Sequence, residues 1–113
     1  MTLSTHVLDA TTGRPAAGIR VRLERGGDGG WVPSGQGQTG PDGRLRLPGD
    51  ESAGQFEPGI YRITFATGAY FGARGSASFY PEVTITFEVT ERGEHYHVPL
   101  LLSPFAYSTY RGS

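Results

Sequence analysis

Glycine and proline break this chain into short segments, and this punctuation limits the possible fold more than any other feature of the sequence. Eighteen glycines and eight prolines are spread over 113 residues. Between these breaks, apolar and polar residues alternate, most clearly in 19–25 and 82–90. A period of two is typical of a strand that is buried on one side. The punctuation and the alternation together predict an all-β protein.

The segments predict a β-sandwich of seven to eight short strands with one short helix at 67–75. The strands are expected at 3–9, 19–25, 31–38, 44–47, 59–66, 82–90, 95–103 and 105–111. A chain of this length can bury one core, so a single domain covering 1–113 is predicted.

Charge and residue types exclude several classes of function. The formal net charge is -1, which argues against a nucleic-acid-binding protein. There is no cysteine, so disulfides, thiolate nucleophiles and cysteine metal sites are excluded. No stretch has the length and apolarity of a transmembrane helix, and the first residues do not resemble a signal peptide. We therefore expect a cytoplasmic protein that does not contact membranes.

The segment 95–103 differs from the other predicted strands because both of its faces are apolar. Val98, Leu100 and Leu102 lie on one face, whereas Pro99 and Leu101 lie on the other. One face is expected to pack in the core, and the other to contact another subunit. The pattern therefore predicts an oligomer that forms through this sheet.

The chain has three histidines, His6, His95 and His97. Alternation places His95 and His97 on the same face of their strand. Histidine can act as an acid or a base near neutral pH, although a single strand histidine is more often structural. An H-x-H pair can also present two imidazoles to a metal ion, but no carboxylate lies at a matching spacing, so we predict no metal site. From these residues alone, a binding module is as consistent as an enzyme.

Three stretches together resemble one family: LSTHVLDATTGRPA, GPDGR and HYHVPLLLSPFAYSTYRGS. They are similar to the 5-hydroxyisourate hydrolases, the transthyretin-related enzymes of urate breakdown, and the resemblance extends over essentially the whole chain. The terminal YRGS is its most specific part, because this tetrapeptide separates the hydrolases from the transthyretin carriers that share the fold. The resemblance implies a transthyretin-like (prealbumin-like) sandwich and a hydrolase.

The resemblance also implies an active site and an assembly. The catalytic residues matched in this sequence are His6, Arg44, His97 and Ser113, and the substrate-binding residues are Tyr110, Arg111 and Gly112. Neither a cofactor nor a metal is implied. Family members are homotetramers whose active sites lie where two dimers meet, so we expect a homotetramer here.

The implied reaction is cofactor-independent hydrolysis of a small molecule, 5-hydroxyisourate, at its N1–C6 amide. The product is 2-oxo-4-hydroxy-4-carboxy-5-ureidoimidazoline, an intermediate of purine degradation. His6 and His97 are expected to activate water, while Arg44 holds substrate oxygens. Three alternatives stay open: a transthyretin-like carrier that binds a small ligand without catalysis, a β-sandwich adhesion or interaction module, and metal-dependent catalysis.

Overall fold

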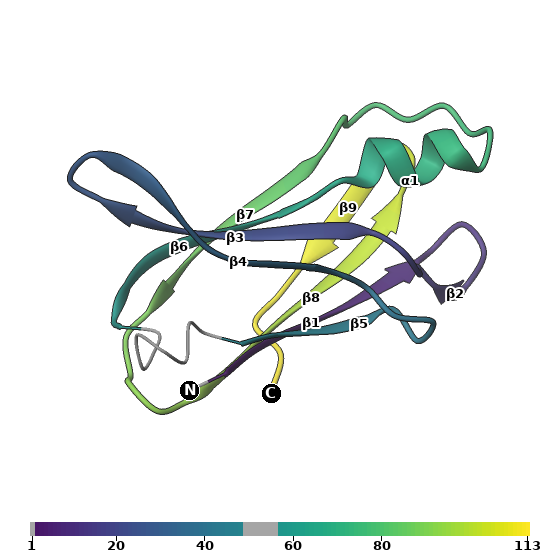
Figure 1. The fold of residues 1–113 in the computed structure, drawn as a ribbon. Helices are drawn as coiled ribbons and strands as arrows, with labels where there is room; N and C mark the ends of the chain where they lie inside the picture. The colour runs from purple at the N-terminus through teal and green to yellow at the C-terminus, as the bar shows by residue number, and fades with distance from the viewer. Residues whose placement is uncertain (1, 49–56) are drawn as a thin grey trace.

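Two β-sheets face each other in the computed structural model, which describes residues 2–48 and 57–113. Figure 1 shows the sheets as two layers, with the helix at one end. The first sheet contains β1 (Thr2–Asp9), β2 (Arg14–Pro15), β5 (Arg44–Pro48), β8 (His95–Ser103) and β9 (Ala106–Thr109). The second contains β3 (Arg20–Gly27), β4 (Gly30–Gln38), β6 (Gly59–Phe65) and β7 (Val83–Val89). The helix, α1, spans Thr67–Ala73.

The β-sandwich predicted from the sequence is confirmed. Each expected strand is present among the described residues, and the short helix lies within the expected range. One additional strand, β2, pairs with the end of β1. It has two residues, too few for any alternation to predict it. In the described part of the chain, no helix has the length and apolar character needed to cross a membrane.

The first sheet is organised around β1. The strand order is β2-β1-β8-β9, and β5 pairs with β1 on the edge that it shares with β2. The pairing of β1 with β8 is parallel, whereas the other pairings of this sheet are antiparallel. The first strand of the chain thus lies beside β8, which is near its end.

The core lies between the two sheets. Alternation sends every second side chain of each strand into this layer and the others outward. Fully buried side chains come from the first sheet (Leu3, Val7, Leu47, Leu100, Leu102) and from the second (Leu23, Tyr61, Ile63, Phe65, Val83). Because this core occupies one side of β1, β5 and β8, their remaining side chains lie on the opposite side, which we call the outer face.

Pro99 explains why β9 ends before the expected boundary at 111. The main-chain groups of Pro99 point toward β9, as do those of His97, because the N–H and C=O groups of successive residues in a strand point in alternate directions. Tyr110 would lie opposite Pro99, which has no N–H to donate. Instead, the Thr109 hydroxyl donates to the Pro99 carbonyl at 2.7 Å. Pairing resumes where the Gly112 N–H donates to the His97 carbonyl at 2.9 Å.

Candidate active site

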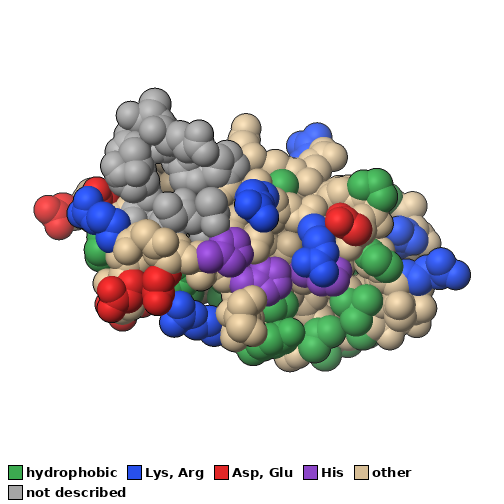
Figure 2. All heavy atoms as spheres, turned by 90° about the horizontal axis from the view of Figure 1, so that it is seen from below, with side chains coloured by type: hydrophobic (Ala, Val, Ile, Leu, Met, Phe, Trp, Pro, Cys, Tyr) green, Lys and Arg blue, Asp and Glu red, His purple; other side chains and the backbone are tan. Residues whose placement is uncertain are grey.

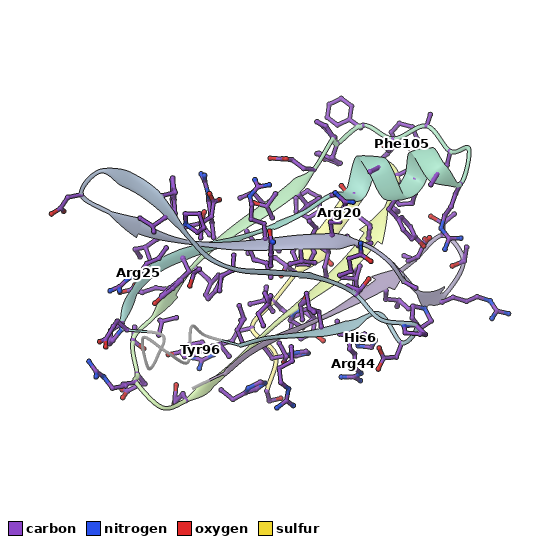
Figure 3. The ribbon with its side chains drawn as sticks, in the orientation of Figure 1. His6, Arg20, Arg25, Arg44, Tyr96 and Phe105 are labelled. Carbon is purple, nitrogen blue, oxygen red and sulfur yellow. The ribbon has the colours of Figure 1, made fainter. Side chains whose placement is uncertain are left out.

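The register of β1 against its two neighbours gathers polar side chains on the outer face. His6 lies opposite Arg44 of β5, and Ser4 lies opposite His97 of β8. His6 and Arg44 point to the same side of the sheet in Figure 3. Figure 2 shows all three histidines on one face, with arginines beside them. The residues come from three strands, so only the folded sheet brings them together.

A tight turn places Arg44 at the start of β5. The Gly43 N–H donates to the Gly40 carbonyl at 2.8 Å, and the Asp42 carboxylate accepts from the Arg44 N–H at 3.0 Å. Gly43 has a φ of 76°, and a Cβ there would lie 2.5 Å from the Val7 carbonyl oxygen. Only glycine suits this position. The turn therefore fixes where β5 begins beside β1, and with it the position of Arg44.

Ser4 connects two of the three histidines. Its hydroxyl oxygen lies 2.8 Å from Nδ1 of His97 and 2.9 Å from Nε2 of His95. The two imidazoles are nearly parallel, with ring centroids 6.4 Å apart and an interplanar angle of 18°. Because Nδ1 of His97 is engaged by Ser4, Nε2 is the atom of this ring that remains for a substrate or a water.

His97 is held in its neutral form near pH 7. Burial lowers its pKa below the ordinary value for histidine, and the positive charges of His95, Arg44 and His6 lower it further. Hydrogen bonding to Ser4 acts in the opposite direction without reversing the shift. A neutral imidazole in hydrogen-bonding reach of water is a general base.

The C-terminal segment passes directly over His97. A Cβ added to Gly112 would lie 2.4 Å from Cδ2 of His97 and 3.2 Å from Cγ of Pro99. No side chain fits in that space, so glycine is required here by the close approach. Ser113 follows in the chain and is exposed. The tail thus forms one wall of the region around the His97 ring.

Arg111 is held by contacts with Tyr96 and Glu94. Its guanidinium stacks on the Tyr96 ring, with Cζ 4.7 Å from the ring centroid, and donates to Glu94 at 3.2 Å. These contacts attach the tail to the edge of the sandwich. Tyr110, which is 60% exposed, borders a cavity of about 340 Å³ at this edge. The cavity is lined mainly by apolar side chains of β7 and β8, together with His97 and residues 109–111.

No group of three or more histidine, cysteine, aspartate or glutamate side chains within 2–48 and 57–113 is arranged to hold a metal ion. One nitrogen of His95 and one of His97 lie within hydrogen-bonding distance of the Ser4 hydroxyl. Their arrangement therefore fits a hydrogen-bonded network better than a metal-binding pair.

A family model described as HIUase/Transthyretin family matches residues 3–112. The chain belongs to this family. A 5-hydroxyisourate hydrolase from Salmonella dublin is 48% identical over 111 residues, covering 98% of this chain and 80% of the relative. The structure of Klebsiella pneumoniae 5-hydroxyisourate hydrolase is 38% identical with a TM-score of 0.83, covering 100% of both chains. Sea bream transthyretin in complex with thyroxine is 34% identical with a TM-score of 0.89, covering 97% of this chain and 93% of that one.

The resemblance to the HIUase/Transthyretin family that the sequence suggested is thus confirmed, as is its transthyretin-like sandwich. The structure places His6, Arg44 and His97 on one face, with Gly112 packed on His97. Ser113 follows Gly112 in the chain. The other two predicted residues, Tyr110 and Arg111, lie at the neighbouring sheet edge. The catalytic and substrate-binding roles of all seven stay predictions.

Ser4 is not among the residues that the sequence predicts for the site. Alternation places it on the same side of its strand as His6. Its contact with His97, however, joins residues 93 positions apart and depends on the register between β1 and β8. A single sequence predicts the face of the strand on which a residue lies, but not which residue of the neighbouring strand will lie opposite it.

We predict that Gly112→Ala displaces the tail or the His97 ring, because the new Cβ would overlap Cδ2 of that ring. The displacement is measured as a changed Cδ2–Hδ2 resonance of His97 in NMR spectra. Gly29→Ala is the matched control, because a Cβ there meets nothing within 4 Å. An unchanged His97 resonance in Gly112→Ala would contradict the close approach.

We also predict that Arg44→Gln raises the pKa of His97, because removal of a nearby positive charge makes protonation easier. An NMR pH titration of the ring Cε1–Hε1 signal measures the midpoint. Arg46→Gln, two residues along the same face of β5, is the control and is expected to shift the midpoint less. A midpoint that stays the same or falls in Arg44→Gln would show that Arg44 does not act on His97.

Proposed function

We propose that this protein is a cofactor-independent 5-hydroxyisourate hydrolase of urate degradation. The observation that carries the proposal is the position of His97 on the same face as His6 and Arg44, beside the C-terminal tail. These groups supply a base, a second imidazole and a fixed positive charge. The Salmonella dublin and Klebsiella pneumoniae relatives carry the name 5-hydroxyisourate hydrolase, which supports the same substrate here.

In the proposed reaction, Nε2 of His97 accepts a proton from water while the water oxygen attacks C6 of the substrate ring. The lowered pKa of His97 supports its assignment as the base, because the ring is then unprotonated at neutral pH. The N1–C6 bond of the tetrahedral intermediate then breaks, and N1 takes a proton. The number of protons taken from water equals the number given to the leaving nitrogen, so no external acid or cofactor enters the reaction.

Arg44 is suited to stabilise the oxyanion that forms at C6. Its guanidinium stays charged throughout the catalytic pH range and can make two parallel hydrogen bonds to substrate oxygens. The turn at 40–43 fixes the start of β5 before the substrate arrives, which limits the reorganisation needed in the transition state. His6, directly opposite Arg44 in the sheet, is placed to orient the substrate or the water.

A transthyretin-like carrier is the alternative, and the likeness to the sea bream transthyretin–thyroxine complex is the observation in its favour. A carrier binds an aromatic ligand through apolar walls and makes no use of a neutral base. The outer face here presents imidazoles and a guanidinium instead, and these groups would lose hydrogen bonds beneath an aromatic ring. We therefore favour the hydrolase.

We predict that the wild-type protein accelerates the ultraviolet decay of freshly generated 5-hydroxyisourate above the spontaneous rate. His97→Ala, His6→Ala and Arg44→Ala should each lower kcat/KM by about 10²- to 10⁴-fold, the range typical of general acid–base and oxyanion-stabilising groups. Arg46→Ala, on the same strand, serves as the control with near-normal turnover. A wild-type protein that leaves the decay rate unchanged would favour the carrier, and near-normal turnover in one variant would remove that residue from the mechanism.

We further propose a homotetramer with its sites between two dimers. Membership of the HIUase/Transthyretin family supports an oligomer, and so does the composition of the outer face. Beside the histidines this face presents the apolar side chain of Leu101, which is 39% exposed. A second copy would bury Leu101 and close the region around His97 from bulk water. The cytoplasmic location stays a prediction.

We predict a mass near four times the 12.1 kDa of one chain by analytical ultracentrifugation. Leu101→Glu should lower that mass, because a charge would be buried in the interface. Val32→Glu is the matched control, since Val32 is a 59% exposed apolar residue of the other sheet. A monomeric wild-type protein would contradict the proposed assembly.

A further inference from the structure

The hydroxyl of Ser4 lies between two imidazoles, and neither Ser4 nor His95 has a step in the reaction described above. The oxygen is 2.8 Å from Nδ1 of His97 and 2.9 Å from Nε2 of His95. His97 is partly buried, whereas His95 is exposed. The three groups thus form a continuous hydrogen-bonded chain from the proposed base to the surface of the chain.

A serine hydroxyl has one proton, and this couples the two rings. When Ser4 donates to His95, its oxygen can only accept from His97, so the His97 proton sits on Nδ1. Nε2 of His97 then keeps its lone pair and can act as a base. When Ser4 donates to His97 instead, Nε2 of His97 carries the proton and cannot accept another. One hydroxyl orientation therefore selects the basic form of His97.

We propose that Ser4 and His95 act with His97 as a proton relay, in which His95 stores the proton taken from water until the leaving nitrogen receives it. This inference rests on the hydrolysis proposed above. It gives Ser4 the function of a proton conductor and His95 that of a reversible proton acceptor.

The relay balances in both directions. When Nε2 of His97 takes the water proton, the Nδ1–H proton of His97 moves to the Ser4 oxygen and the Ser4 hydroxyl proton moves to Nε2 of His95. His97 is then neutral with its proton on Nε2, and His95 carries the charge. When Nε2 of His97 gives its proton to the leaving nitrogen, the two internal transfers reverse. All three side chains return to their starting forms.

Electrostatics gives the direction of transfer. His97 is faced by His6 from β1, by Arg44 from β5 and by His95 on its own strand, while Arg111 of the tail is turned toward Glu94. A charge retained on His97 would lie among these groups in a partly buried position, and both effects lower its pKa. Transfer to His95, which lies opposite Thr2 and so farther along the sheet from His6 and Arg44, moves the charge away from these groups.

Three variants separate a relay from a packing effect. Ser4→Ala removes the hydroxyl, Ser4→Thr keeps it, and His95→Gln keeps a hydrogen-bonding partner for Ser4 but cannot carry a proton. We expect Ser4→Ala and His95→Gln to lower kcat by about 10-fold or more with little change in KM, as expected for loss of a proton-transfer step. Ser4→Thr should stay near wild type, as should the control Ser108→Ala on exposed β9. The double variant Ser4→Ala/His95→Gln should be no slower than either single variant, since both interrupt one pathway.

The tautomer of His97 separates the two explanations, because a change in packing alone would not alter which ring nitrogen carries the proton. In ¹⁵N NMR spectra of the unliganded wild-type protein near pH 7, we expect the His97 proton on Nδ1. In Ser4→Ala this preference should be lost, and in Ser4→Thr it should be retained. A His97 proton found on Nε2 in the wild type would overturn the relay.

The kinetic results separate failure of the relay from failure of the proposed function. An active wild-type protein whose His95→Gln variant turns over normally would overturn the relay and leave the hydrolase intact. Additive losses in the double variant would also overturn the relay, because they indicate two independent contributions. A wild-type protein that does not open 5-hydroxyisourate would overturn the proposed function, and the relay with it.

Discussion

The parallel pairing of β1 with β8 is the interaction on which the candidate site depends. It places Ser4 beside His97 and His6 beside Pro99, and so joins the two ends of the chain in one sheet. A parallel pair cannot be closed by a hairpin, and here all four strands of the second sheet lie between β1 and β8 in the sequence. The site is therefore a consequence of the completed sandwich.

The core fixes which side of that pairing carries the chemistry. A shift of one residue between β1 and β8 would turn every side chain of one strand to the other face. Burial of Leu3 and Val7 on one strand and Leu100 on the other opposes such a shift. Packing energy in the core thus sets the distance between Ser4 and His97 on the outer face.

A proline, which has no main-chain N–H, and a glycine, which has no side chain, shape the space around His97. Pro99 interrupts the ladder beside β9, and Gly112 restores a single pair to the His97 carbonyl. The glycine also lets the tail lie against the imidazole. The anchor of Arg111 on Tyr96 and Glu94 holds this arrangement from the other side of the tail. These contacts hold the tail in place, whereas the substrate-binding role of Arg111 stays a prediction.

The sequence by itself determined the all-β architecture, nearly every strand, and the faces on which His6, His95 and His97 lie, because these follow from local alternation and turn chemistry. Its resemblance to a known family also predicted that Arg44 and the C-terminal residues belong to the site. Only the tertiary structure decided that Ser4 bridges two histidines, that Arg111 turns toward Tyr96, and that β9 ends at Thr109, before the position opposite Pro99. Alternation gives each residue a face, whereas contacts across strands depend on register, and register is set by the packing of a core whose members are far apart in the chain.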